Sequence, residues 1–538
     1  MPITHADSPP VAAALPRRLL RVWHSIGIPT LADALFLVVL FQLLHLGATG
    51  FFNDPGTGWH IRTGDTIVAT GQIPVVDSFS YTREGHAWVE TQWVGDVLMY
   101  WGFSAGGYSL LAVVTAIVLA GLFRWIYRTQ MAQGGWPILT LLITLAAACA
   151  ASGHFLVRPL LASTIGIPLC FWWSTQYARG GFSSTRLWLL VPIAAVWCNV
   201  HPGVLGGIAT IGLCCLGTLF EGLVSRQEHS RREMLRRGTM LLAVSATMGV
   251  VTLVNPYGVD WHLWIIRLMG MGALSQHVHE WMPPTWTDPD AIAAIILVAA
   301  TAILACTRRN RIKPAEIPII LFWLSQALGS SRHLPLAGMV LALQLGRLLA
   351  NLRVDSGWVG AVAKRLPLFS PGIRKTELRT GGGLVSGAAI AVLIVLLATG
   401  ATVPAIGLGV AGPPVDRYPP EAVEYLRMHG TEARLFNEIN FGGMLIHQLP
   451  ETPVFIDDRF GLYGPEFVEE YVVTVRRPNT HADDLLDTWR IDTVLISNTA
   501  PLHAWLADSP KWTAAFADNV ATVYTRNLRQ DGEGYDTL

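Results

Sequence analysis

Long apolar runs alternate with short polar corners along most of the chain. Between Leu31 and Ala405 we count about eleven runs, most of them near the roughly 17–25 residues that a helix needs to cross a bilayer. This pattern predicts a mainly α-helical protein built on a polytopic transmembrane bundle of about 11 spans. The predicted spans lie near residues 31–50, 106–127, 136–153, 159–178, 186–200, 203–225, 236–254, 289–306, 314–330, 333–350 and 382–405.

The basic residues predict the orientation of these spans. With a cytoplasmic N-terminus, the inner corners before residue 413 carry 23 lysines and arginines, whereas the outer corners carry five. Cytoplasmic loops are enriched in positive charge, so the opposite orientation is rejected. An odd number of spans then places the C-terminal segment outside the membrane.

Three parts follow one another along the chain. Residues 1–27 form a basic, cytoplasmic leader without a cleavage site, so we interpret the first span as a retained anchor. Residues 28–405 form the transmembrane domain and include a long outer loop at 51–105. After a Gly/Pro-rich hinge, residues 413–538 form an extracytoplasmic domain.

Helical spacing of apolar residues in the outer loop predicts an amphipathic helix that lies in the membrane interface. Glu90, Gln92 and Asp96 lie off its apolar stripe. The stripe consists of Trp93, Val94, Val97, Leu98 and Trp101.

The C-terminal domain is predicted to be a soluble α/β domain. A proline and an acidic residue open a helix at 420–426. Short buried strands are expected at 434–437, 454–457, 493–497 and 521–525. From Pro413 onward the chain carries ten lysines and arginines against twenty aspartates and glutamates, which argues against a nucleic-acid partner.

The loop after the first span carries Asp54, His60 and Arg62 at the lip of the membrane. Ionisable groups at this depth are expensive to keep, so they are candidates for function. Asp54 can act as a general base or bind a metal ion or a sugar hydroxyl. The alternative is structural, because an aspartate before Pro55 also forms an Asx turn that ends a helix.

Polar groups also gather at the outer corners of other spans. Eight of the sixteen histidines lie there or in the loops, whereas the inner segments hold three. This distribution indicates an outward-facing site; the alternative is that the loop residues are simply solvated. The outer histidines are His60, His86, His154, His201, His262, His277, His279 and His333. Other polar residues at these corners are Asp54, Glu90, Arg158, Asn199, Asn255, Tyr257, Glu280 and Arg332.

Arg158 and Arg332 are candidate phosphate ligands. Arg332 stands beside His333 and follows Ser330 and Ser331, whose hydroxyls can assist it. The alternative for both arginines is contact with lipid headgroups. Asn199 and His201 occupy an apolar turn, where the alternative to ligand binding is a hydrogen bond between helices.

Other familiar chemistry is missing from the sequence. The segment 276–281 holds two histidines and Glu280 but lacks the spacing of a zinc-binding helix, so no metal site is assigned. The six cysteines all lie in apolar spans and are interpreted as small buried residues. In the C-terminal domain, Asp457, Asp458, Arg459 and Tyr463 follow a predicted strand, where ligands often bind in α/β layers. Their alternative is a salt bridge at the strand end.

Several of these motifs resemble a bacterial group of polytopic membrane proteins related to the GT-C superfamily of glycosyltransferases. The resemblance covers most of residues 30–530. It rests on Asp54-Pro55, Trp59-His60-Ile61-Arg62-Thr63-Gly64-Asp65, Pro74, Asp77-Ser78-Phe79-Ser80-Tyr81-Thr82, Trp88-Val89, Gln92-Trp93, Asn199, His201, Gly203, Asn255-Pro256-Tyr257-Gly258, Glu280-Trp281, Arg332-His333, Phe436-Asn437, Asn440-Phe441-Gly442-Gly443, Phe455-Ile456-Asp457-Asp458-Arg459 and Leu462-Tyr463-Gly464.

The resemblance implies a fold and an activity. GT-C enzymes take a sugar from a polyprenyl-phosphate donor on the outer side of the membrane. The loop after their first span carries the catalytic acidic residue, which here corresponds to Asp54 as the general base. It implies a bacterial inner-membrane location. Some relatives carry Asp-Pro-Asp in that loop, whereas this chain has Gly56 in the third place, so dependence on a divalent cation stays open and no other cofactor is implied.

The resemblance also assigns roles to the other residues. We expect a polyprenyl-phosphate sugar as donor and a glycan, lipid or protein as acceptor. His60, Arg62, Arg158, His201, Arg332 and His333 are expected to bind the donor phosphate or sugar. Glu90, Trp93, Asn199, Tyr257, Glu280, Asp457, Asp458, Arg459 and Tyr463 are expected to bind the acceptor or to support the site.

Two other functions stay open from the sequence. One is a non-catalytic scaffold or transport component of a surface-polysaccharide assembly system. Transport would be favoured by two matching halves with broken helices, and the chain shows no such duplication. The other is a lipid-linked oligosaccharide ligase, which differs only in the size of its donor.

Overall fold

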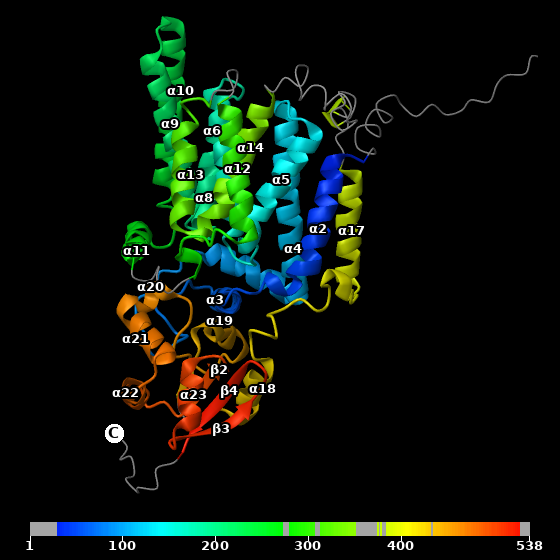
Figure 1. Ribbon diagram of the computed structural model, residues 1–538. Helices are drawn as coiled ribbons and strands as arrows, with labels where there is room; N and C mark the ends of the chain where they lie inside the picture. The colour runs from blue at the N-terminus through cyan, green and yellow to red at the C-terminus, as the bar shows by residue number, and fades with distance from the viewer. Residues whose placement is uncertain are drawn as a thin grey trace, which may run out of the picture.

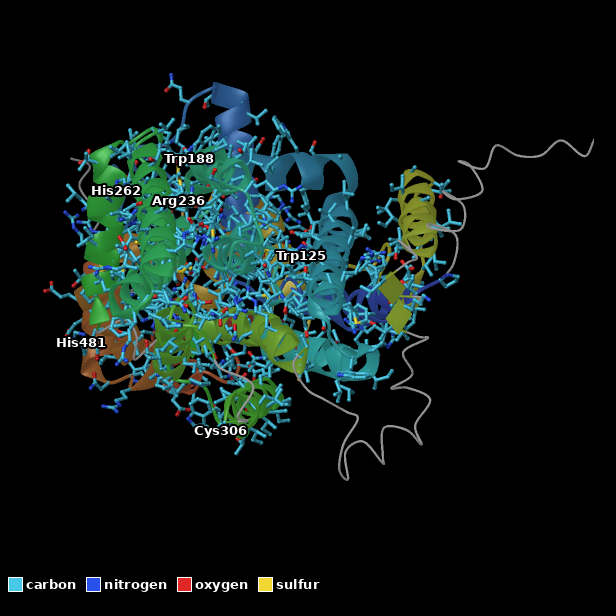
Figure 2. All side chains as sticks on the ribbon, turned by 90° about the horizontal axis from the view of Figure 1, so that it is seen from above. Trp125, Trp188, Arg236, His262, Cys306 and His481 are labelled. Carbon is cyan, nitrogen blue, oxygen red and sulfur yellow. The ribbon has the colours of Figure 1, made fainter. Side chains whose placement is uncertain are left out.

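The computed structural model describes residues 29–272, 279–306, 312–350, 374, 375, 377, 378, 383–431 and 434–527. Long helices stand side by side in a bundle, and the C-terminal domain lies at one end of it (Figure 1). At the opposite end α9 and α10 extend together beyond the other helices (Figure 1). Seen from above in Figure 2, Arg236 of α10 and His262 of α11 lie at one side of the bundle and α17 lies at the other.

Each of the eleven predicted apolar runs carries a helix. The bundle contains α2 (Leu31–Gly50), α4 (Trp93–Gln133), α5 (Pro137–Ala151), α6 (Leu161–Ala178), α7 (Ser184–Trp188), α8 (Leu190–Val200), α9 (Val204–Val224), α10 (Glu228–Val251), α12 (Pro289–Ala305), α13 (Ile317–Gly329), α14 (Leu334–Ala350) and α17 (Leu384–Ala398). The connections predicted to be outer corners add α3 (Thr57–Thr70), η1 (Ser152–His154), α11 (Val259–Gly270), η3 (His279–Trp281), η4 (Ser331–His333) and η6 (Pro404–Ile406).

The predicted number of 11 spans is not confirmed. By length and composition, four helices among the described residues can cross a membrane: Trp93–Gln133, Pro137–His154, Val204–Val224 and Ser331–Ala350. Five further apolar helices are shorter, with 10–17 residues. A helix of 13 residues such as α13 is about 20 Å long, which is less than the roughly 30 Å of a hydrocarbon core.

Helix α14 forms the centre of the bundle. Nearly all of its residues are buried, and it packs against α4, α5, α6, α12 and α13. Near its C-terminal end, Arg347 Nη1 lies 2.5 Å from Glu316 Oε1, and Gln344 Nε2 donates to Glu316 Oε2 at 3.0 Å. Arg179 Nη2 reaches the same carboxylate at 2.5 Å. This buried charge is therefore compensated by groups from several helices.

The predicted interfacial helix in the outer loop is confirmed as a helix. It is the first part of α4, which departs from helical geometry at Gly106 and Gly107 before the apolar part begins. Gly107 has a φ of 61°, a conformation that suits a residue without Cβ. Leu98 and Trp101 are exposed on this first part, whereas Asp96, expected away from the apolar stripe, is buried.

The C-terminal domain is an α/β domain with a four-stranded sheet of order β1-β2-β4-β3. Only the β1–β2 pair is parallel. Its elements are α18 (Pro420–His429), β1 (Leu435–Asn437), α19 (Ile439–Gln448), α20 (Phe460–Tyr463), α21 (Pro465–Arg476), α22 (Thr480–Thr488), β2 (Thr493–Ser497), α23 (Pro501–Asp508), β3 (Trp512–Ala517) and β4 (Ala521–Arg526). The expected helix at 420–426 and three of the four expected strands are confirmed.

The strand expected at 454–457 is wrong. This segment is buried and extended, but side chains and the outer loop bind its backbone instead of a neighbouring strand. The Asn437 side chain accepts from Phe455 N at 2.8 Å and donates to Ile456 O at 2.8 Å. Val454 forms an isolated bridge with Ser80. β3 was missed because its burial is irregular and gives no clean alternation.

The outer loop joins the bundle to the C-terminal domain. Helix α3 packs against both α4 and α19. A Cβ on Gly58 would lie 2.2 Å from Gly443 O, so the two helices approach as closely as glycine permits. Trp59 and Trp88 belong to the same hydrophobic cluster as the C-terminal domain. The boundaries 28–405 and 413–538 stay predictions.

Candidate functional site

A cavity of about 1260 Å³ lies between one end of the bundle and the C-terminal domain. Its walls come from the loop after α2, the connection between α5 and α6, the α8–α9 turn, α11, η3, η4 and the C-terminal domain. Of the predicted site residues, those that line it are Asp54, Glu90, Arg158, His201, Glu280, Arg332, Asp458 and Arg459.

Arg158 forms ion pairs with three carboxylates at this cavity. Its Nε lies 2.5 Å from Asp54 Oδ2, its Nη2 3.5 Å from Asp458 Oδ2, and its Nη1 3.6 Å from Glu280 Oε2. We call these four residues the Arg158 centre. They come from four separate segments of the chain, so only the folded protein assembles them.

Backbone contacts fix the position of this centre. Val157 N donates to Phe51 O at 3.0 Å, which ties the corner that carries Arg158 to the end of α2. Gly56 N donates to Asp54 Oδ1 at 3.2 Å, so Asp54 also forms the expected Asx turn. A Cβ on Gly56 would lie 2.8 Å from Asp458 Oδ2 and 3.3 Å from Arg158 Nη2. The glycine therefore provides the space that Asp458 occupies.

Burial and charge shift the ionisation of the Arg158 centre. Burial raises the pKa of Asp54, and the adjacent Arg158 offsets part of that rise. Burial and the nearby Asp54 charge raise the pKa of Asp458 to about 7. Burial also disfavours ionised Glu280, but Arg158 and Arg332 outweigh it and lower the pKa of Glu280.

Arg332 is a second cation at the cavity. Among the residues described, no ion pair joins it to a carboxylate, and its guanidinium lies over the Trp281 ring at 5.4 Å from the centroid. Ser330 Oγ and Ser331 Oγ donate to Glu280 O at 2.8 and 3.2 Å. The two serines therefore hold η4 against η3, while the arginine faces a cavity that can accept an anion.

Hydrogen bonds define the tautomer of His201, which lines the cavity. Its Nδ1 accepts from Gly203 N at 2.9 Å and lies 2.7 Å from Ser163 Oγ. Since a backbone N–H can only donate, Nδ1 carries no proton and the neutral ring is protonated at Nε2. Burial and the nearby Arg332 lower the pKa of His201 to about 3, so the ring is neutral and serves as a hydrogen-bond donor.

Four predicted donor-binding or supporting residues of the first loop and the bundle lie away from the cavity. His60 Nδ1 contacts Asp96 Oδ1 at 2.6 Å, and both side chains are fully buried. Arg62 pairs with Asp65 at 2.6 Å on α3. Trp93 Nε1 donates to Asn199 Oδ1 at 2.8 Å.

Two more predicted residues are also outside the cavity lining. Tyr257 OH donates to Pro74 O at 2.9 Å and accepts from Glu90 N at 3.1 Å. The centroid of the His333 ring lies 6.2 Å from that of the Trp323 ring, which belongs to α13.

Asp457, Arg459 and Tyr463 form a buried network with the outer loop. Arg459 Nη2 lies 2.7 Å from Asp457 Oδ2, and its Nη1 lies 2.7 Å from Asp77 Oδ1. Tyr463 OH donates to Asp457 Oδ2 at 2.7 Å. The guanidinium also lies over the Trp88 ring at 4.6 Å. The network ties the C-terminal domain to the outer loop, with Arg459 at the edge of the cavity.

Four residues that the sequence did not nominate support the site. Trp59 Nε1 donates to Asp458 Oδ1 at 2.8 Å, Asp96 holds His60, Asp77 holds Arg459, and Ser163 holds His201. Trp59 and Asp77 stand inside the motifs that carry the GT-C resemblance, which was the available signal. Ser163 lies in an apolar helix and offered none.

The described residues do not fit a divalent cation. None of their histidine, cysteine, aspartate and glutamate side chains form a group of three or more that could hold a metal ion. At the Arg158 centre, a guanidinium already stands among the three carboxylates. His277 lies outside the described residues.

Comparisons with known proteins show the fold. No protein-family model and no curated protein match the sequence. An Archaeoglobus fulgidus oligosaccharyltransferase tethered with an acceptor peptide is similar, with a TM-score of 0.51 and 11% identity over 88% of this chain and 70% of that one. Archaeoglobus fulgidus AglB in complex with an inhibitory peptide and a dolichol-phosphate gives a TM-score of 0.52 and 11% identity over 87% and 69%.

ArnT from Cupriavidus metallidurans, bound to undecaprenyl phosphate, gives a TM-score of 0.45 and 14% identity over 93% of this chain and 99% of that one. The oligosaccharyltransferase structures confirm the GT-C-like resemblance at the level of the fold. The chain is a membrane protein with a helical GT-C-like bundle and a small C-terminal sheet.

Proposed function

We propose that this chain is an integral membrane glycosyltransferase. It transfers a sugar from a polyprenyl-phosphate donor to an extracytoplasmic glycan, lipid or protein acceptor. One observation carries the proposal: a cavity at the end of a GT-C-like bundle holds a carboxylate–arginine centre beside a second arginine without an ion-pair partner among the described residues. The similar AglB was solved with a dolichol-phosphate, which supports a lipid phosphate as the donor class.

The donor phosphate binds Arg332 in this proposal. A lipid phosphate that leaves the sugar needs a cation, and a guanidinium can bind it through two hydrogen bonds. Arg158 is largely engaged by carboxylates and contributes mainly charge. His201 donates from Nε2 to a phosphate or sugar oxygen, because its Nδ1 is occupied. His60, Arg62 and His333 support the surrounding helices instead.

Asp54 acts as the general base. It accepts the proton of the acceptor hydroxyl as that oxygen attacks the anomeric carbon of the sugar. Its contact with Arg158 favours the ionised carboxylate and offsets part of the effect of burial. The acceptor approaches from the side of the C-terminal domain, and Glu90, Glu280 and Arg459 line the cavity there. Trp93, Asn199, Tyr257, Asp457 and Tyr463 hold the elements that form its walls.

The proposal is tested by donor binding and transfer. Purified protein is screened against a panel of polyprenyl-phosphate sugars by native mass spectrometry, together with Arg332→Ala, Asp54→Asn and the control Arg62→Ala. We expect Arg332→Ala to lose binding and Asp54→Asn to keep it but to lose transfer by about 10²-fold or more. Arg62→Ala, whose ion pair lies off the cavity, keeps both.

Two outcomes would change the assignment. Asp54→Asn with wild-type turnover would remove Asp54 as the base while leaving the transferase intact. Failure of every donor to bind the wild-type protein would refute the transferase and favour the scaffold or transport function.

A further inference from the structure

Asp458 reaches the cavity from the C-terminal domain. It follows the buried segment 454–457, whose backbone is held by Asn437 and by the outer loop. Trp59 Nε1 donates to Asp458 Oδ1 at 2.8 Å, and Gly56 leaves room for Oδ2. The carboxyl group is therefore positioned by both domains, although it belongs to only one of them.

Asp54 and Asp458 share one guanidinium unequally. Asp54 Oδ2 is 2.5 Å from Arg158 Nε, whereas Asp458 Oδ2 is 3.5 Å from Nη2. Two buried carboxylates at one site do not both ionise at neutral pH without a large cost, so the pair retains a proton. That proton resides on the member with the weaker cation contact, which is Asp458. Environments that separate two carboxyl groups in this way distinguish an acid from a base.

We infer that Asp458 is the general acid of the proposed transfer, a second catalytic residue supplied by the C-terminal domain. The inference rests on the proposed function and extends it. Asp54 takes the proton of the acceptor hydroxyl, whose oxygen bonds to the anomeric carbon. The bond from that carbon to the phosphate oxygen breaks, and its electron pair stays on the oxygen. Asp458 gives its proton to the leaving phosphate.

The two carboxyl groups are then restored together. The proton that Asp54 received passes to Asp458, its neighbour across Arg158, before the next donor binds. The net products are the extended acceptor and the polyprenyl phosphate, and no further reactant is needed. The order of roles follows from the contacts with Arg158, because its guanidinium lies closer to Asp54 than to Asp458 and therefore stabilises the Asp54 anion more strongly.

This assignment predicts the pH dependence of turnover. Burial and the nearby Asp54 charge raise the pKa of Asp458 to about 7, so the acid is protonated below that pH and ionised above it. The kcat/KM of the wild-type protein should therefore decline as the pH rises through about 7, because kcat/KM reports the pKa of an essential acid in the free enzyme. An essential general acid produces this decline in activity at high pH, which is the alkaline limb of the pH profile. Removing the acid removes the alkaline limb.

The experiment compares the pH profiles of three proteins with the donor identified in the binding screen. Asp458→Asn should lower kcat by about 10²-fold, keep the KM for the donor within a few fold and abolish the alkaline decline. Glu280→Gln is the matched control, since it also removes one carboxylate from Arg158 but should keep the decline. Thermal unfolding confirms that each variant is folded.

A second measurement needs no donor. The infrared absorption of protonated carboxyl groups is compared between about pH 6 and pH 8 in wild type and in Asp458→Asn. At the lower pH we expect the wild-type protein to show an absorption band of a protonated carboxyl group that is missing from the variant. An alkaline limb that persists in Asp458→Asn, wild-type kcat in that variant, or an unchanged infrared band would overturn the inference. A wild-type protein without any transfer would instead refute the proposed function.

Discussion

Arg158 and Gly56 show how closely the site is packed at the scale of single residues. Gly56 has an ordinary helical φ of −78°, so its backbone conformation does not require a glycine. Its lack of a side chain instead leaves room for a neighbouring group. In the sequence, Gly56 stands out only as a departure from Asp-Pro-Asp. The structure gives a physical reason for it, because a carboxylate from the C-terminal domain takes the place that a side chain would fill.

Gly56→Ala should therefore reduce transfer without unfolding the protein. The new Cβ would lie 2.8 Å from Asp458 Oδ2, which must move away from Trp59 and Arg158. We expect a loss of kcat similar in size to that of Asp458→Asn, about 10²-fold. Gly249→Ala on α10 is the control, because nothing lies within 4 Å of its added Cβ. Full activity in Gly56→Ala would show that the close contact is unimportant.

Glu90 gives a pH-dependent prediction that does not require a substrate. Burial raises its pKa to about 7 from an ordinary value near 4.5. Above the ordinary value the unfolded chain releases the proton first, so ionisation of Glu90 favours unfolding as the pH rises towards 7. Glu90→Gln removes this effect and still accepts from Gln92 N. The variant should gain up to roughly 3 kcal/mol relative to wild type between about pH 4.5 and 7.

Thermal unfolding at several pH values measures this difference. The gain should be small near pH 4.5, grow up to about pH 7 and stay level above it. A difference in melting temperature that does not change with pH would contradict the predicted ionisation of Glu90.

The sequence could nominate Asp54, Arg158 and Arg332 because each is a charge next to an apolar run. It could not show which groups meet. Trp59 and Asp458 are 399 positions apart, and no periodicity records a contact of that range. His60 shows the converse. The sequence places this histidine at the lip of the membrane, whereas in the folded protein it is fully buried against Asp96.

At the scale of elements, the meeting of α3 and α19 decides how the C-terminal domain is held. Gly58 and Gly443 let the two backbones touch, and a Cβ on Gly58 would lie 2.2 Å from a carbonyl oxygen that cannot rotate away. Gly58→Ala should therefore loosen the domain and cost roughly 1–3 kcal/mol of stability. Thermal unfolding and the rate of tryptic cleavage measure the effect, with Gly121→Ala as a control that meets nothing within 4 Å.

The pattern of apolar residues predicted the helices of the bundle better than the strands of the C-terminal domain. Every long apolar run forms a helix, because continuous apolar runs of this length favour helices over strands. The segment 454–457 has the apolar residues of a strand, yet the Asn437 side chain and the outer loop bind its backbone. Burial was predicted correctly there and strand pairing was not, since pairing depends on partners far away in the sequence.

At the scale of the whole molecule, the C-terminal domain lies at one end of the bundle (Figure 1). Residues of this domain and of that end of the bundle line the cavity. The orientation of the bundle in the membrane therefore decides which compartment supplies the acceptor. Few basic residues lie at the corners near the cavity, and most of those before the C-terminal domain lie at the predicted inner corners. The positive-inside rule then predicts an extracytoplasmic cavity.

A tag appended after Leu538 tests this orientation. We expect it to be accessible to an impermeant reagent in intact spheroplasts, whereas a tag placed before Met1 should react only after the membrane is permeabilised. The pair of tags controls for leakage, because broken cells would label both. A C-terminal tag that reacts only after permeabilisation would place the cavity in the cytoplasm. The outward-facing site, the lipid-linked donor and the roles of Asp54 and Asp458 would then all have to be reassigned, since each depends on a cavity that opens at the outer surface.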